Sequence, residues 1–230
     1  MRILIVNPNT TESMTALIQD CARAVGAPGT VLRTINPTTG PPSIQSHLDD
    51  AVAAVEVVRL ITAGAGEGFD GFVIACFGDP GLYAARESVE APVVGIAEAA
   101  MRTAGYLGRT FSVVTTLQRV VPHTRELAHR YGVANLCAGV HACDIPVLDL
   151  ETDPTAYARI LASCQQALEV DRSDAIVLGC AGMADLCAKL SADLGVPVID
   201  GVAAATLEVE KLVRLGLRTS KHGEFAPPPT

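Results

Sequence analysis

One pattern occurs twice in this chain of 230 residues. Residues 69–78 read FDGFVIACFG, and residues 173–182 read SDAIVLGCAG. Each copy starts near an acidic residue, continues with apolar residues typical of a buried strand, and ends in Cys-x-Gly. Cys76 and Cys180 are 104 residues apart, and a second matched pair, APVVGIAEAAM and VPVIDGVAAAT, has an offset of 105. The repeat predicts two similar halves, with a cysteine at the same place in each.

Strand-like and helix-like segments alternate in both halves. The predicted strands are residues 2–6, 31–35, 71–75, 93–96, 111–114, 139–143, 175–179 and 197–199, with helices between them. This order is typical of parallel βαβ units with right-handed crossovers. Aromatic residues make up only 4% of the chain and tryptophan is absent, as suits parallel sheets covered by helices. We expect an α/β fold of two pseudo-symmetric lobes, each a four-stranded parallel sheet flanked by helices, with the active site in the cleft between them.

The repeat also suggests where the lobes divide. The first α/β lobe is predicted to contain residues 1–97 plus 205–230 and to carry Cys76. The second α/β lobe is predicted to contain residues 98–204 and to carry Cys180. The tail from Thr219, which is rich in proline at Pro227 to Pro229, is predicted to be loose.

Charge and composition exclude several classes of function. A net charge of -8 argues against a nucleic-acid or acidic-membrane partner. No apolar run approaches the ~18 residues that a membrane span needs, and the first apolar stretch is too short for a signal peptide. Seven cysteines do not resemble a secreted disulfide framework. We therefore expect a cytoplasmic protein with a small-molecule substrate.

Four polar or glycine-containing turns follow predicted strands. They are Asn7–Thr11, Cys76–Gly81, Thr115–Thr116 and Cys180–Met183. Ligands of open parallel sheets bind beyond the carboxyl ends of the strands. If a pseudo-twofold axis relates the halves, all four turns surround one cleft, and the Pro/Gly/Ser-rich loop Pro37–Ser46 is long enough to cover it.

Two cysteines that face each other suit a reaction that must reach both faces of one carbon. A free thiol has a pKa of about 8.5, and a helix N-terminus lowers this value. Asp79-Pro80 is predicted to provide the N-cap and first residue of the helix after Cys76. Gly78 and Gly182 allow close approach of the backbone to a ligand, and free N–H groups after Cys180 could bind an oxyanion.

A metal site is the competing interpretation of the remaining cysteines. Cys137, His141 and Cys143 could ligate zinc, but Cys-x3-His-x-Cys is not a common zinc spacing. No metal is expected, and the absence of GxGxxG and Walker motifs argues against a nucleotide cofactor. Five cysteines without a repeat partner are expected to be structural: Cys21, Cys137, Cys143, Cys164 and Cys187. Four histidines are expected to be solvated: His47, His123, His129 and His222.

The motifs NPNTT, ACFGDPG, VVTT and LGCAGM occur in an order that resembles the aspartate/glutamate/hydantoin racemase superfamily, and within it the hydantoin and allantoin racemases. The similarity extends from RILIVNPNTTESMT to LGLRTSKHG. It implies two lobes, no cofactor, a homo-oligomer, and racemisation by the catalytic pair Cys76 and Cys180. The substrate-binding positions that it implies are Asn9, Ser43, Ile44, Phe77, Gly78, Thr115, Thr116, Ala181 and Gly182.

The resemblance implies a racemase of 5-monosubstituted hydantoins. One cysteine, as a thiolate, would remove the C5 proton, and the other, as a thiol, would return a proton to the opposite face. No arginine occurs in the four turns, which favours a neutral hydantoin over aspartate or glutamate as the substrate.

Several alternatives stay open. Allantoin is itself a hydantoin, so an allantoin racemase would use the same chemistry. Other members of the superfamily are amino-acid or diacid racemases, decarboxylases and isomerases, but a decarboxylase of this kind needs only one protonating cysteine. The chain could also be a binding protein, or a redox sensor that joins Cys76 to Cys180.

Overall fold

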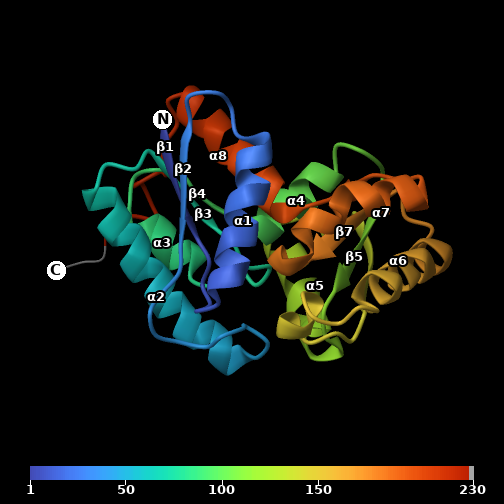
Figure 1. The fold of residues 1–230 in the computed structure, drawn as a ribbon. Coiled ribbons are helices and arrows are strands. Elements are labelled where there is room, and N and C mark those ends of the chain that lie inside the picture. Colours follow the sequence, from blue (N-terminus) through green and yellow to red (C-terminus); the bar gives the residue numbers. More distant parts are fainter. Residues whose placement is uncertain (228–230) are drawn as a thin grey trace.

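The computed structural model describes residues 1–227 and contains two four-stranded parallel sheets flanked by helices (Figure 1), which confirms the predicted fold class. The first sheet has the strand order β2-β1-β3-β4, and the second has the order β6-β5-β7-β8. The strands of the first sheet are β1 (Arg2–Val6), β2 (Val31–Ile35), β3 (Gly71–Ile74) and β4 (Val93–Gly95). Those of the second are β5 (Phe111–Thr115), β6 (Cys137–Ala142), β7 (Ala175–Gly179) and β8 (Val198–Ile199). The two sheets therefore repeat one topology.

Helices follow the strands in both halves. In the first half they are α1 (Glu12–Val25), α2 (His47–Gly66), α3 (Leu82–Ser88) and α4 (Ile96–Ala104). In the second half they are the short η1 (Gln118–Val120), α5 (Val121–Arg130), η2 (Val147–Leu150), α6 (Ala156–Asp171), η3 (Ala181–Leu186), α7 (Cys187–Leu194) and α8 (Gly201–Arg214). Within residues 1–227, no helix combines the length and apolar character that a membrane span requires.

Helices α4 and α8 lie between the two sheets (Figure 1). They pack against each other. In addition, α8 contacts α1 and strands β3, β4 and β7, and α4 contacts strands β4, β7 and β8. Both helices thus contact strands of both sheets. The lobe limits after residues 97 and 204 stay a prediction.

The acidic residue near the start of each repeat fixes one strand to another. Asp70, which precedes β3, accepts a hydrogen bond of 2.7 Å from the backbone N–H of Arg2. Asp174, which precedes β7, accepts hydrogen bonds from the backbone N–H groups of Arg109 and Thr110, at 2.8 and 3.0 Å. Both carboxylates satisfy backbone donors at the beginning of the adjacent strand, which explains why this part of the repeat is acidic.

Asp79 does not cap the helix that follows it, so this prediction from the Asp-Pro pair is wrong. Helix α3 begins at Leu82, with Gly81 as its N-cap. The Asp79 carboxylate instead accepts hydrogen bonds from the backbone N–H groups of Ala97 and Glu98, at 3.0 and 2.9 Å, in the first turn of α4. The hydroxyl of Tyr131 donates a third bond of 2.6 Å. A positive φ of 47° at Asp79 turns the chain away from the geometry of an N-cap.

The segment after Thr219 is more fixed than predicted. The Thr219 backbone N–H bonds to the Glu90 carbonyl at 2.8 Å, and Lys221 Nζ bonds to the carbonyls of Arg86 and Glu87 at 2.6 and 2.8 Å. The ring of Phe225 lies edge-on to Tyr83 of α3, with 5.8 Å between the ring centres. The rest of the predicted loose tail, residues 228–230, lies outside the described residues.

Candidate active site

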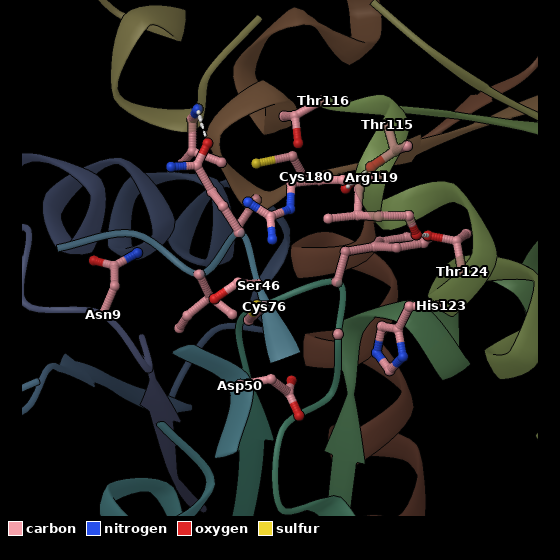
Figure 2. Close-up of a pocket in the computed structure, with 18 of the residues that line it drawn as sticks. Asn9, Ser46, Asp50, Cys76, Thr115, Thr116, Arg119, His123, Thr124 and Cys180 are labelled. Atoms are coloured by element: carbon pink, nitrogen blue, oxygen red, sulfur yellow. Dashed lines mark hydrogen bonds between the residues drawn. The ribbon is translucent and has the colours of Figure 1, made fainter. Parts of the chain in front are cut away.

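A cavity of about 190 Å³ lies at the carboxyl ends of β1, β3, β5 and β7. Residues from all four predicted turns and from both halves of the chain line it. Of the predicted site residues, those in its lining are Asn9, Ile44, Cys76, Phe77, Gly78, Thr115, Thr116, Cys180 and Ala181. Figure 2 shows Cys76 and Cys180 among the residues around the pocket. The arrangement brings together thiols that are far apart in the sequence.

Both thiols have the same local structure. Cys76 follows β3 and Cys180 follows β7, and both are partly exposed to the cavity. The backbone N–H of Gly78 is hydrogen-bonded to the Cys76 thiol, and that of Gly182 is hydrogen-bonded to the Cys180 thiol. The Cys-x-Gly repeat therefore places one backbone donor on each sulfur, where it favours the thiolate over the thiol.

Burial opposes ionisation of both cysteines. It raises the pKa of Cys180 to about 11, although the Gly182 N–H acts in the opposite direction. Burial raises the pKa of Cys76 still more, and the nearby Asp50 carboxylate adds to this effect. The helix-terminus argument predicted a lowered pKa, but loss of contact with bulk water is the larger effect here.

Threonine and asparagine side chains lie beside the two thiols. The Thr115 hydroxyl donates a hydrogen bond of 3.1 Å to the Gly179 carbonyl, so the same oxygen can still accept a hydrogen bond. The Asn9 amide donates to Met14 Sδ at 3.1 Å, and its oxygen accepts a bond of 2.9 Å from the Thr11 N–H. These bonds hold Thr115 and Asn9 in fixed orientations at the cavity wall.

The loop Pro37–Ser46 joins the two halves across the cavity. Ile44, Gln45 and Ser46 contribute to the lining. The Gln45 side-chain oxygen accepts a hydrogen bond of 3.2 Å from the backbone N–H of Val147 in the second half. Ser43 lies behind the lining, where its hydroxyl accepts a bond of 2.8 Å from the Gln45 amide. Ser43 therefore positions Gln45 and does not itself face the cavity.

Gly182 also lies outside the lining. A Cβ at this position would come within 3.1 Å of Leu150 Cδ1 and 3.6 Å of Cys180 Sγ. A larger residue would therefore crowd both the thiol and its apolar neighbour. The predicted role of Gly182 in binding remains a prediction, whereas its N–H contact with the sulfur is a feature of the structure.

Polar side chains that the sequence analysis did not select complete the cavity. They are Gln45, Ser46, His47, Asp50, Arg119, His123 and Thr124. Asp50 lies in the first turns of α2 and His123 in the first turn of α5. The prediction that His123 is a solvated histidine is wrong, because its Nε2 atom is buried. Arg119 lines the cavity as well, so the lack of arginine in the four turns does not argue against a carboxylate substrate.

The zinc interpretation does not fit the geometry. Cys137 Sγ contacts the Gly139 carbonyl at 3.6 Å, whereas Cys143 Sγ contacts the Thr116 carbonyl at 3.7 Å. The His141 Nε2 atom is 2.6 Å from the Asp171 carboxylate. In residues 1–227, no group of three or more His, Cys, Asp or Glu side chains is arranged to hold a metal ion.

Comparison with known proteins shows similarity over nearly the whole chain. The family model described as Asp/Glu/Hydantoin racemase matches residues 3–209. A hydantoin racemase from Rhizobium meliloti is 45% identical over 99% of this chain and 95% of its own length.

Solved structures agree with this comparison. An allantoin racemase from Klebsiella pneumoniae superposes with a TM-score of 0.97 at 52% identity, over 100% of this chain and 94% of its own. An arylmalonate decarboxylase superposes with a TM-score of 0.65 at 19% identity, over 93% of this chain and 92% of its own. The second likeness shows a shared fold only.

Proposed function

This chain belongs to the Asp/Glu/hydantoin racemase family, and we propose that it is a cofactor-independent racemase of 5-monosubstituted hydantoins that uses Cys76 and Cys180 as its two catalytic residues. The observation that carries the proposal is the pair of cysteines from opposite halves in one cavity, each with a glycine N–H on its sulfur. Inversion of a carbon needs a proton donor and a proton acceptor on opposite faces, and this pair supplies one group of the required kind from each half.

The reaction transfers one proton in each half-step. The C5 carbon of a hydantoin lies between a carbonyl carbon and a nitrogen, so loss of its proton gives a planar enolate. One cysteine, as a thiolate, takes the proton and becomes a thiol. The other, as a thiol, gives its proton to the opposite face and becomes a thiolate. The reverse reaction exchanges the roles, so each cysteine acts as the base for one enantiomer.

The glycine N–H groups assist whichever sulfur is charged. Burial makes each thiolate costly, and a hydrogen bond from a backbone N–H lowers that cost without adding a formal charge. Thr115, Thr116 and Arg119 line the same cavity and carry hydrogen-bond donors for the carbonyl oxygens of the ring. A donor that meets the C4 oxygen would stabilise the enolate as charge moves onto that atom.

The rest of the cavity suits a neutral ring with a substituent. Apolar side chains in the lining are Met14, Ile44, Phe77, Val120 and Val147. These side chains would contact the C5 substituent. Asn9 would bind the ring amides, and Gly78 and Ala181 would let backbone groups approach the ring closely. In this proposal Ser43 contributes through Gln45, and Gly182 contributes through the Cys180 thiol.

Allantoin is the second candidate substrate. The 52% identity to the Klebsiella pneumoniae allantoin racemase favours it, whereas the 45% identity to the Rhizobium meliloti enzyme favours other hydantoins. The ureido group of allantoin could bond to the polar side chains of Gln45 or Arg119, which lie among the apolar lining residues. The chemistry at C5 is the same for both substrates.

A cytoplasmic homo-oligomer is also part of the proposal. All seven cysteines are unpaired, as expected for a reducing compartment. Leu48, Val52 and Val55 form an exposed apolar stripe along α2, with exposed fractions of 73%, 44% and 68%. Such a stripe on a surface helix favours contact with another copy of the chain.

Racemisation of single enantiomers tests the proposed function. The purified protein, without added cofactor, is incubated with one enantiomer of 5-benzylhydantoin and, separately, of allantoin, and optical rotation is followed against the spontaneous rate. We expect rotation to decay to zero for at least one of the two, and the faster substrate identifies the preferred class. If folded protein leaves both rates at the spontaneous level, the proposal is wrong.

A further inference from the structure

The surroundings of the two cysteines differ, although their positions in the repeat match. A Cβ on Gly78 would lie 3.9 Å from Cys76 Sγ. The same point is only 3.0 Å from Asp50 Oδ1 and 3.6 Å from His123 Nε2. A carboxylate and an imidazole from two different helices therefore adjoin the same space beside Gly78 as the Cys76 thiol.

The equivalent position near Cys180, that of a Cβ on Gly182, has apolar side chains as neighbours. A Cβ on Gly182 would lie 3.6 Å from Cys180 Sγ, 3.1 Å from Leu150 Cδ1 and 3.5 Å from Met14 Cε. Met14 is the third residue of α1, and His123 is the third residue of α5. Each of these two helices begins in one half and reaches the cysteine of the other. The same framework therefore places a carboxylate and an imidazole near the glycine that follows Cys76, and two apolar side chains near the glycine that follows Cys180.

Asp50 and His123 have buried atoms that the fold does not use. Within residues 1–227, neither Asp50 Oδ1 nor His123 Nε2 has a hydrogen-bond partner, although both atoms are buried. An unpaired buried polar atom is costly and is found mainly where a ligand, a water molecule or a proton transfer uses it. Figure 2 shows both side chains on the same side of the pocket.

A second cavity, of about 220 Å³, lies behind these two side chains. Asp50, Gly78 and His123 line both cavities and so form the wall between them. The other titratable groups that line the second cavity are Asp79, Tyr83, Arg130 and Tyr131. Its size and polar lining suit several water molecules.

We propose that Asp50 and His123 form a proton relay between Cys76 and the second cavity, so that Cys76, but not Cys180, exchanges its proton with water while the substrate is bound. This inference rests on the proposed racemase function. After Cys76 takes the C5 proton, the thiol S–H bond breaks, the proton passes to Asp50 or His123, and the thiolate is restored. The relay residue then releases the proton to water in the second cavity, so charge and protons balance.

Charges around the relay affect how readily it accepts a proton. Burial raises the pKa of Asp50, which makes its carboxylate a better proton acceptor, while His123, His47 and Arg130 act in the opposite direction. His47 lies edge-on to His123, with 6.0 Å between the ring centres, and Glu126 lies 4.0 Å from the other ring nitrogen of His123. Carboxylates and imidazoles therefore lie close together around Asp50 and His123.

The test measures deuterium uptake into substrate that has not been inverted. Each enantiomer of the preferred hydantoin is incubated separately in D2O. At low conversion the remaining substrate is separated from its inverted product, and the deuterium content of each is measured by mass spectrometry. We expect recovered substrate to gain deuterium only for the enantiomer that Cys76 deprotonates, which is the one that Cys180→Ser still exchanges. Asp50→Asn and His123→Gln should each slow this uptake about tenfold or more. In both variants, the product formed from the enantiomer that Cys180 deprotonates should contain deuterium, as it does in the unaltered protein.

Matched controls separate a relay from a structural effect. Glu56→Gln on α2 and His129→Gln on α5 remove a carboxylate and an imidazole from the same helices outside the cavity lining, and should leave uptake unchanged. A distorted cavity would slow the inversion of both enantiomers as well as the uptake, and this outcome in either relay variant would overturn the inference. Equal uptake by both enantiomers in the unaltered protein, or uptake by neither, would overturn it too. Absence of any racemisation would instead contradict the proposed function itself.

Discussion

At the scale of single residues, the glycine two positions after each cysteine has a defined role. It supplies an N–H to the sulfur, and it has no side chain to occupy the space between the thiol and its neighbours. Gly78→Ala would place a methyl group 3.0 Å from Asp50 Oδ1, whereas Gly182→Ala would meet the flexible end of Leu150. The glycine of each Cys-x-Gly repeat therefore provides both space beside the thiol and a backbone N–H donor.

The raised pKa values predict slow alkylation of both thiols at neutral pH. Only the thiolate reacts with iodoacetamide, and burial raises the pKa of Cys180 to about 11. We expect modification of Cys180 to accelerate about tenfold per pH unit above neutrality, as the thiolate fraction grows. Peptide mass spectrometry after timed reaction measures this rate. A rate for Cys180 that already levels off near neutral pH would contradict the assignment of a raised pKa, and substrate should protect both cysteines.

At the scale of elements, the two halves cap equivalent helices in different ways. Asp200 precedes α8 and accepts hydrogen bonds from the N–H groups of Val202 and Ala203, at 2.8 and 2.9 Å. The equivalent residue before α4 is Gly95, which has no side chain to accept such bonds. The carboxylate of Asp79 takes this place, and a Cβ on Gly95 would overlap it. A distant residue thus compensates for a difference between the repeats.

Loss of the Asp79 carboxylate should destabilise the protein. Asp79→Ala leaves two backbone donors of α4 and the Tyr131 hydroxyl without their buried acceptor, which we expect to cost about 3 kcal/mol of unfolding free energy. Urea denaturation measures the change, with Asp20→Ala on the exposed side of α1 as the control. A loss no larger than that of the control would show that the cap contributes little.

The same carboxylate should make stability depend on pH. Burial raises the pKa of Asp79 to about 7, above the value of about 3.9 for an unfolded aspartate. The folded state therefore binds the Asp79 proton more tightly than the unfolded state does. The stability that this proton contributes is complete below about pH 4 and is lost as pH rises through about 7. The unfolding free energy of the unaltered protein minus that of Asp79→Asn should therefore fall from about pH 4 to about pH 7. A difference that grows over this range would contradict the raised pKa.

At the scale of the whole molecule, the repeat was enough to predict the two parallel sheets and the two thiols at matching strand ends. Strand ends of a parallel sheet share one edge, so the position of each cysteine at the carboxyl edge of its own sheet follows from topology. Asp50 and His123 do not have a comparable signal. An acidic residue in the first turns of a helix is commonly explained by the helix dipole, and a histidine on a polar helix by solvent. Only the packing of α2 and α5 across the cavity distinguishes these two residues from such cases.

The capping of α4 was unpredictable from sequence for a similar reason. Asp79-Pro80 has the local pattern of an N-cap, but the positive φ at Asp79 and the contact with Tyr131, 52 residues away, depend on tertiary structure. The contacts of Thr219 and Lys221 with the carbonyls near α3 also join segments more than 120 residues apart. Local pattern does not determine such long-range bonds.

The proposed mechanism makes Cys76 the base for one enantiomer and Cys180 the base for the other, and exchange by the single-cysteine variants tests this assignment. Cys76→Ser and Cys180→Ser are each incubated in D2O with each enantiomer, and the C5 proton signal and optical rotation are followed by NMR and polarimetry. Both variants should lose racemisation, and any exchange that they retain should affect opposite enantiomers. Full racemisation by either variant, or exchange of the same enantiomer by both, would contradict it.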